Sequence, residues 1–341
     1  AERLAQAVGY VGAGTVEFLY QPAEQLFAFL EVNTRLQVEH PITEVTNDFD
    51  VVKAQIRVAA GEALEERPTE FGHAVEARLN AEDPDRDFAP APGRITLLEF
   101  PTGPGIRVDT GVGEGDSIPA DFDSMIAKII AHGRDRGEAL ARLRRAMAET
   151  TVVVEGGATN KSFVLQLLRE PEVVGPDGAP GAEEGGDGAP GWADTGWIDR
   201  VRAEGRLVSH QHSGVALVAA GIDAYVDELQ VEVSRLMETA RGGRPQVQHQ
   251  VGRPVDLKLR GVPWQVTTVQ TGPHRFRVTV AGAGQEQTVD AEVERLGEFH
   301  GRLTVNGRRH RIVSAIHGPT HLVEVDEVIH RVSRDEGGVL R

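Results

Sequence analysis

Hydrophobic and polar positions follow different periods along this chain, and the change of period predicts two structural units. Before residue 171, runs that alternate like strands are mixed with amphipathic stretches of helical spacing, which is typical of an α+β fold. Between residues 246 and 332 the apolar positions have a period of two, which predicts short antiparallel strands. Residues 171–197 between them are rich in glycine, proline and acidic residues and predict a disordered linker.

The first unit is expected to open with a β-hairpin and to continue with mixed strands and helices. Strand-like runs lie at residues 14–20, 26–32, 73–80, 92–100 and 105–110. The first two are joined by a short turn segment and predict the hairpin. Helical spacing lies at residues 49–60, 135–149 and 160–169, with Asn47 or Asp48 expected to cap the first of these helices.

The second unit is expected to contain one long helix and a closed antiparallel sheet. Apolar positions recur at intervals of three and four over residues 213–239, which predicts one continuous buried stripe. The stripe comprises Val215, Val218, Ile222, Tyr225, Leu229, Val233 and Leu236. About eight strands should follow, with Asn306-Gly307 as a hairpin turn. We expect them to form a β-barrel that the helix fills or plugs.

Composition narrows the possible functions. The formal net charge is −16, which argues against nucleic-acid binding because affinity for phosphate backbones rests on clustered lysine and arginine. The absence of cysteine excludes disulfides, thiolate metal sites and a cysteine nucleophile. No apolar run reaches the ~18 residues that span a bilayer, and the first residues do not form a basic and apolar leader. We expect a soluble, cytoplasmic protein without nucleic-acid or membrane partners.

The hairpin carries the first chemical signal. A turn centred near Glu24 would place Glu17 opposite Glu31, and two facing carboxylates repel unless a cation lies between them. Mg²⁺ prefers such hard oxygen ligands, and Asn33 shares the face of Glu31 because it lies two residues further along the strand. The alternative is that the two glutamates are unrelated solvated residues on an edge strand.

Polar residues continue beyond the hairpin. We expect Arg35, Gln37 and Glu39 to extend the strand alternation and to line the same face. An arginine beside a carboxylate suits an anionic substrate, because the cation orients it and the carboxylate accepts a proton. His40 precedes Pro41, and we interpret it as a hydrogen-bonded structural histidine.

The run EVNTRLQVEHPITE at residues 31–44 resembles the signature of biotin carboxylases, the ATP-grasp enzymes that carboxylate biotin. The resemblance continues through residues 72–84, 90–95 and 121–128 and covers roughly residues 10–168. It implies the C-terminal part of an ATP-grasp domain at residues 1–61 and a biotin carboxylase C-terminal domain at residues 62–170. After the linker, residues 198–335 would form the helix and β-barrel domain.

The resemblance also implies a nucleotide and metal site. Glu17, Glu31 and Asn33 match the family's ligands for Mg²⁺ or Mn²⁺, which sits on the phosphates of the substrate ATP. Leu19 matches a position near the adenine. One departure from the family's pattern is the turn QPAEQ at residues 21–25, which lacks the expected Asp-Gly type of turn and leaves the register of Glu17 against Glu31 open.

A bicarbonate and biotin site is implied in the same way. Arg35, Gln37 and the backbone of Val38 match the bicarbonate-binding positions, and Glu39 matches the base that deprotonates bicarbonate. Arg78 matches the cation that stabilises the enolate of biotin. Arg35, Glu39 and Arg78 are therefore the expected catalytic residues.

The second unit looks like the domain that joins biotin carboxylase to the carrier and carboxyltransferase parts of acyl-CoA carboxylases. Residues 195–200 and 325–334 resemble actinobacterial α subunits. No methionine is followed by lysine, so the Ala-Met-Lys-Met biotinylation motif of a carrier domain is absent from this sequence. In the family the glycine-rich lid precedes the hairpin, so we expect the chain to be a fragment that does not turn over ATP alone.

The leading hypothesis is therefore part of the biotin carboxylase component of an acetyl-, propionyl- or longer acyl-CoA carboxylase. Its expected partners are a biotin carboxyl carrier domain, a carboxyltransferase and the N-terminal half of the ATP-grasp enzyme. The alternative is a noncatalytic assembly module that binds the carboxyltransferase. Another ATP-grasp ligase, such as a carbamoyl-phosphate enzyme, is disfavoured because Arg78 and the barrel would then lack a purpose.

Overall fold

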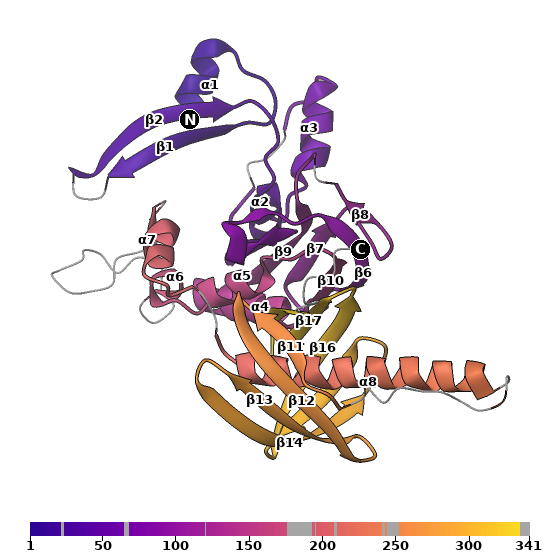
Figure 1. Cartoon of the computed structure of the whole chain (residues 1–341). Coiled ribbons are helices and arrows are strands. Elements are labelled where there is room, and N and C mark those ends of the chain that lie inside the picture. Colours follow the sequence, from indigo (N-terminus) through magenta and orange to yellow (C-terminus); the bar gives the residue numbers. More distant parts are fainter. Residues whose placement is uncertain are drawn as a thin grey trace.

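The chain forms a protruding hairpin, an α+β body and a closed β-barrel with a long helix, as seen in a computed structural model (Figure 1). The structure describes residues 1–21, 24–64, 68–119, 121–175, 193–194, 196–207, 210–240, 243 and 252–334. Most of the predicted linker lies outside the described residues. The domain boundaries drawn from the sequence stay predictions.

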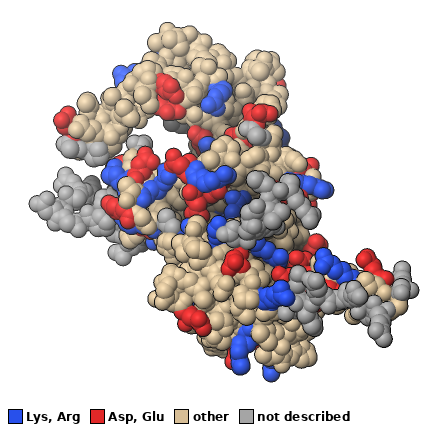
Figure 2. Space-filling model, viewed as in Figure 1, with Lys and Arg blue, Asp and Glu red and all other residues tan. Residues whose placement is uncertain are grey.

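The predicted hairpin is confirmed, including its register. Helix α1 (Glu2–Val8) precedes strands β1 (Thr15–Gln21) and β2 (Leu26–Asn33). Glu17 pairs with Glu31, and the ladder slips by one residue immediately after Glu17, which marks a β-bulge. The hairpin reaches away from the body and leaves a hollow beneath it (Figure 2).

The chain after the hairpin differs from the expectation. A helix that the sequence pattern missed, α2 (His40–Asn47), begins with Pro41 in its first turn and ends at Asp48 in the left-handed conformation. Helix α3 (Val51–Ala59) is capped by Asp50, whose carboxylate accepts the Lys53 N–H at 2.8 Å, and not by either predicted residue. Asp48 cannot cap α3 because it closes the preceding helix.

Two three-stranded sheets and several helices build the α+β body. Its elements are β3 (His73–Asn80), β4 (Glu82–Asp83), η2 (Pro84–Arg86), β5 (Ala89–Pro90), β6 (Gly93–Glu99), β7 (Ile106–Thr110), β8 (Ser117–Ile118), β9 (Met125–Gly133), α4 (Arg136–Glu149), β10 (Thr151–Glu155), α5 (Lys161–Leu167) and α6 (Pro171–Val174). The sheets run in the orders β3-β9-β7 and β10-β6-β8. Strands β9 and β10 were not predicted, because both are nearly continuous apolar runs that lack a polar face.

The second unit contains the predicted long helix and barrel. After α7 (Trp197–Ala203) comes α8 (Ser213–Ala240), and the barrel strands are β11 (Val255–Leu259), β12 (Val262–Gly272), β13 (Arg275–Gly282), β14 (Gln285–Arg295), β15 (His300–Val305), β16 (Arg308–His317), β17 (Thr320–Val325) and β18 (Val328–Arg334). They close in sequence order, with β18 pairing back to β11. None of the described helices is long and apolar enough to cross a membrane.

The predicted stripe on α8 is buried only over part of its length. The first half of the helix packs into the barrel core beside Leu257 and Val323. Further along, Val233 and Leu236 are 44% and 40% exposed, so the expectation of one continuous buried stripe was wrong. The reason is geometric, because α8 runs on beyond the barrel (Figure 1).

The barrel is joined to the body by a small apolar seam and a buried ion pair. Leu97 and Val153 of the body pack against Val313 and Ala315 of the barrel. Nearby, Lys161 donates to both oxygens of Glu324 at 2.8 and 2.9 Å, and these side chains are 0% and 5% exposed. Such a pair is stable only when both partners are present, so it fixes α5 against β17.

Candidate functional site

The β3-β9-β7 sheet has an apolar face and a charged face. Ala77, Leu79 and Ile129 are buried in the body core, in which α4 covers the sheet. Because neighbouring strand residues point to opposite faces, Arg78 and Lys128 project to the other side. Helix α2 packs on β3 and β9, and the segment leading into it contacts these charged residues.

Four polar side chains converge at the open end of the hairpin. The Asn33 amide nitrogen donates to the Glu17 and Glu31 carboxylates at 2.7 and 3.2 Å, and the Gln37 amide donates to the same Glu17 oxygen at 3.3 Å. The amide hydrogen bonds relieve the repulsion between the two facing carboxylates. Rotating the Asn33 amide would present its oxygen instead. This donor set of two carboxylates and an amide fits a hard divalent cation such as Mg²⁺ or Mn²⁺.

The expected continuation of the strand beyond Asn33 was wrong. Strand β2 ends there, and the next residues turn into α2. The turn nevertheless brings Glu39 to Arg78, whose Nη2 lies 2.7 Å from a Glu39 oxygen although the two residues are 39 positions apart. Both side chains are about half exposed and accessible to a substrate.

A buried carboxylate lies under this pair. The Glu76 side chain is 7% exposed, and one of its oxygens lies 3.7 Å from Arg78 Nε. Burial raises the pKa of Glu76, while Lys128 and Arg78 act in the opposite direction. Glu76 was not among the residues selected from the sequence, although it alternates with Arg78 along β3.

Lys128 is a second residue that sequence reasoning missed. Its ammonium group donates to the Val38 carbonyl at 2.9 Å and lies 3.4 Å from Asp109. It therefore supports the backbone of the predicted bicarbonate position from below. A single lysine in the apolar run of β9 was the available signal, because a buried lysine requires a partner.

An arginine and two carboxylates hold α2 against the sheet. Arg107 Nη1 donates to Glu44 of α2 at 2.6 Å, and Arg107 Nε donates to Asp109 at 2.8 Å. Burial favours the neutral form of Asp109, but these contacts with Arg107 outweigh it and lower its pKa. The same hydrogen bonds raise the pKa of Arg107. These contacts thus hold α2, which follows the turn after β2, against the β3-β9-β7 sheet.

The remaining predicted residues lie nearby but have few contacts. Arg35 is exposed and donates to the Leu36 carbonyl at 3.3 Å. Leu19 is 56% exposed on the hairpin. His40 Nδ1 lies 2.7 Å from the Gln37 carbonyl, the kind of contact that we expected of a structural histidine.

A further histidine and carboxylate group lies where the start of α8 meets the barrel. Ligand atoms of His212, His310 and Asp326 lie within 4.8 Å of one another. Asp326 already accepts the Arg311 N–H at 2.8 Å and contacts His310 Nδ1 at 2.6 Å. Both oxygens of the Asp326 carboxylate therefore already have hydrogen-bond partners, and we interpret the group as a hydrogen-bonded turn and not as a metal site.

Comparisons with known families assign the hairpin and the body. Residues 76–178 match the family described as "Biotin carboxylase C-terminal domain", and residues 1–67 match "Carbamoyl-phosphate synthase L chain, ATP binding domain". This part of the chain is homologous to biotin carboxylases and to acyl-CoA carboxylase alpha subunits.

Individual relatives agree. The chain is 49% identical over 177 residues to biotin carboxylase 1 of Bacillus subtilis, covering 51% of this chain and 39% of that protein. It is also 49% identical over 177 residues to the biotin-dependent acyl-coenzyme A carboxylase alpha3 subunit of Mycobacterium leprae, covering 51% and 29%. The chain thus spans well under half the length of these relatives.

Solved biotin carboxylase structures are also similar to this chain. The biotin carboxylase subunit of pyruvate carboxylase superimposes with a TM-score of 0.52 at 32% identity, covering 61% of this chain and 42% of that one. The same values hold for the biotin carboxylase domain dimer of Hydrogenobacter thermophilus 2-oxoglutarate carboxylase, a complex with MgADP, ADP and bicarbonate.

Proposed function

We propose that this chain supplies one wall of the biotin carboxylase site of an acyl-CoA carboxylase, which carboxylates carrier-bound biotin with ATP and bicarbonate. The observation that carries the proposal is the contact between Glu39 and Arg78 beside the Glu17, Glu31 and Asn33 group. The two groups are linked through the turn after β2, because Gln37 contacts Glu17 and Glu39 two residues later contacts Arg78, and this link supports the proposal of a shared site.

Glu17, Glu31 and Asn33 would hold the divalent cation of the nucleotide. When bound there, the cation would offset the negative charge of the ATP phosphates. Gln37, which already donates to Glu17, would keep that carboxylate oriented. Leu19 would offer its exposed apolar side chain to the nucleotide base.

Arg35, Gln37 and the Val38 backbone would bind bicarbonate next to this site. Arg35 is exposed and its guanidinium can orient an oxyanion. Glu39 would accept the bicarbonate proton, because its carboxylate is accessible at the same edge. Arg78 would hold Glu39 in position and stabilise negative charge on the biotin ring.

The exposed surface of the hairpin is an argument for a partner that completes the ATP-grasp site. Its apolar side chains are widely exposed, and such a surface is costly in water. The exposed set includes Phe18, Leu19, Tyr20, Leu26, Phe27, Phe29, Leu30 and Val32. We assign this surface to the N-terminal half of the ATP-grasp enzyme.

Metal and nucleotide binding tests the proposal. Titration of the purified chain with Mn²⁺ and ATP, followed by the Mn²⁺ paramagnetic signal, should show binding that Glu31→Gln weakens about tenfold or more, because a metal ligand loses its charge. Glu24→Gln, at the turn end of the same hairpin, makes the same chemical change away from the site and should bind like the unaltered chain. Equal affinity in all three proteins would contradict the assignment.

A noncatalytic assembly module is the second candidate. It is favoured by the half of α8 that extends beyond the barrel, where Val226, Val231, Val233, Leu236 and Met237 are exposed. This apolar surface would suit a carboxyltransferase partner. Failure of the unaltered chain to bind Mn²⁺ and ATP, even when supplied with the N-terminal half, would favour this candidate.

A further inference from the structure

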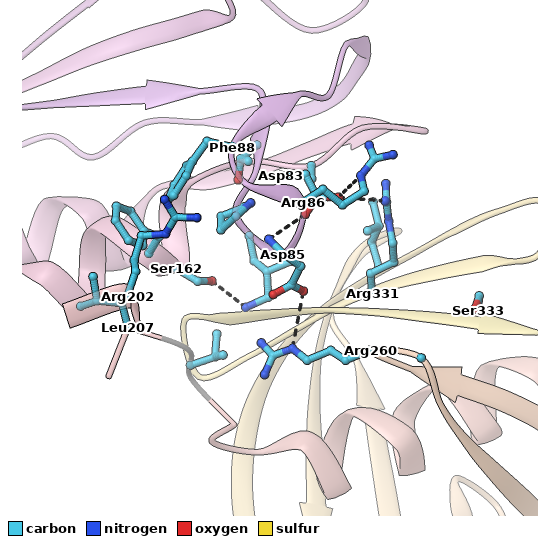
Figure 3. Close-up of a pocket in the computed structure, with 18 of the residues that line it drawn as sticks. Asp83, Asp85, Arg86, Phe88, Ser162, Arg202, Leu207, Arg260, Arg331 and Ser333 are labelled. Atoms are coloured by element: carbon cyan, nitrogen blue, oxygen red, sulfur yellow. Dashed lines mark hydrogen bonds and ion pairs between the residues drawn. The ribbon is translucent and has the colours of Figure 1, made fainter. Parts of the chain in front are cut away.

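A pocket of about 740 Å³ lies between the body and the barrel, apart from the site described above. Its walls come from the loop around η2, from α5 and α7, and from the barrel strands β11 and β18 (Figure 3). The volume is within the range of small-molecule sites, which is roughly 300–1,000 Å³. None of the predicted metal, bicarbonate or biotin residues lines it.

The lining has more positive than negative side chains, although the whole chain is acidic. Five cationic residues line the pocket, namely Arg86, Arg202, Lys258, Arg260 and Arg331, against the three carboxylates of Asp83, Asp85 and Asp199. The lining thus has two more cationic than anionic side chains, and one surplus positive charge remains when the pair of Arg202 with Asp87, outside the lining, is included. Although the chain as a whole has a net charge of −16, this local excess of positive charge favours an anionic ligand.

Two guanidinium groups share one carboxylate. Arg86 Nε and Arg331 Nη1 approach the same Asp83 oxygen at 2.9 and 3.4 Å, and Asp83 is 7% exposed. One carboxylate offsets at most one of these charges. Figure 3 shows Arg86 and Arg331 beside each other around Asp83, with Asp85 closer to the barrel. Arg331 Nη2 already donates to the Gly157 carbonyl at 2.7 Å, but a neutral carbonyl does not offset the charge, so this wall keeps positive charge for further anionic oxygens.

The other cations face the pocket from different elements. Arg260, at the start of the turn between β11 and β12, lies 3.5 Å from Asp85. Arg202 of α7 lies 4.9 Å from the Phe88 ring centre and pairs with the exposed Asp87. Because the guanidinium groups are spread over separate walls, a single carboxylate cannot contact them together. A diphosphate offers enough oxygens in one ligand.

The remaining wall is apolar. Phe88 and Phe163 pack edge to face with ring centres 4.6 Å apart, and Leu207 lies on the same side of the pocket. We propose that this pocket binds a small organic diphosphate or triphosphate, with its phosphates on Arg86, Arg260 and Arg331 and its organic part against Phe88. Because these residues belong to both units, the ligand bridges body and barrel and stabilises their joint.

Calorimetric titration with inorganic pyrophosphate, in EDTA and at fixed ionic strength, tests the proposal. We expect saturable binding at one site per chain, weakened about tenfold or more by Arg86→Gln or Arg260→Gln, since each removes a charge-assisted contact. Arg302→Gln, which removes an exposed guanidinium from the barrel surface, should leave the affinity unchanged. Circular dichroism identifies any variant that fails to fold. If one pocket variant does not fold, the affinity of the other pocket variant tests the proposal.

A parallel titration of Glu31→Gln separates this pocket from the proposed ATP site. The metal is chelated and the hairpin carboxylate is removed, so pyrophosphate binding that persists unchanged must lie elsewhere. Absence of saturable binding by the unaltered chain would overturn the pocket assignment, as would an affinity in both pocket variants equal to that of the unaltered chain. Either result leaves the proposed carboxylase site untouched, because that site is tested with Mn²⁺ and ATP.

Discussion

Burial separates the charged residues of this chain into those that can act on a ligand and those that hold the fold. Glu39 and Arg78 are about half exposed, and pairs in that environment add only about 0–1 kcal/mol to stability. Their contact therefore matters for position rather than for folding. Glu76 and Lys128 beneath them are nearly buried, so they serve the rigidity of the same site.

Two buried barrel histidines give the chain a pH-dependent stability. Burial, with Arg260 nearby, lowers the pKa of His330 to about 4 from 6.5, and burial has the same effect on His321. Between pH 6.5 and pH 4 the two histidines bind protons in the unfolded chain but not in the folded chain. Their contribution to the free energy of unfolding is therefore fully present above pH 6.5 and is lost as the pH falls towards 4.

We predict that His330→Phe makes this loss smaller, by up to about 3 kcal/mol over the window, because the apolar ring takes no proton. Urea unfolding across the window from pH 6.5 to pH 4 measures it. His274→Asn alters an exposed turn histidine and should keep the slope of the unaltered chain. An identical slope for His330→Phe and the unaltered chain would count against the burial argument.

At the scale of elements, the fit of α8 into the barrel depends on small residues. Ala216, Ala219 and Ala220 are fully or almost fully buried in the barrel core. At Gly221 an added Cβ would lie 2.4 Å from Val266 Cγ1, which is too close for the helix to stay in place. Glycine is therefore present for close packing and not for backbone freedom.

We predict that Gly221→Ala destabilises the barrel by about 1–3 kcal/mol through overpacking, although alanine favours helix by about 0.5–1 kcal/mol. Gly214→Ala is the matched control in the same helix, because no atom lies within 4 Å of its added Cβ. That variant should be neutral or slightly stabilising. Chemical denaturation measures the free energy of unfolding of both variants. Equal changes in the two would show that helix propensity, and not overpacking, determines the effect of Gly221→Ala.

At the scale of the whole molecule, the joint between body and barrel holds a buried charge pair. Burial lowers the pKa of Lys161, and Glu324 opposes this by charge and hydrogen bonding. The pocket proposed for a phosphorylated ligand lies at the same joint, since Ser162 of α5 and Ile329 of β18 also line it. The joint therefore couples the stability of the two units.

We predict that Lys161→Met destabilises the molecule by about 3–5 kcal/mol, because it leaves the Glu324 carboxylate without its main partner. The double variant Lys161→Met with Glu324→Leu should recover much of the loss. Arg169→Gln removes one partner of the more exposed Arg169–Glu327 pair across the same joint and should cost less than about 1 kcal/mol. Thermal unfolding of the four proteins measures these differences, and no recovery in the double variant would contradict them.

Local alternation made much of the fold predictable from sequence. Strand β3 and the long helix were found within a residue of their observed bounds, because one face of each is apolar over a clear period. The unpredicted β9 is buried on both faces and has no alternation. Helix α2 was missed because it is only 8 residues long and buries just Pro41 and Thr46, so its sequence carries no long apolar stripe of helical spacing.

The sequence by itself determined the β-hairpin and the likeness to biotin carboxylases, because both depend on neighbouring residues in one short segment. It left open whether Glu17 faces Glu31 or both are unrelated edge residues, and the structure shows the facing pair. Only the tertiary structure decided that Lys128 supports Val38 and that α8 leaves the barrel halfway. It also created the cationic pocket, whose arginines come from distant segments. Contacts between distant segments depend on how whole elements pack, and local periodicity carries no record of that packing.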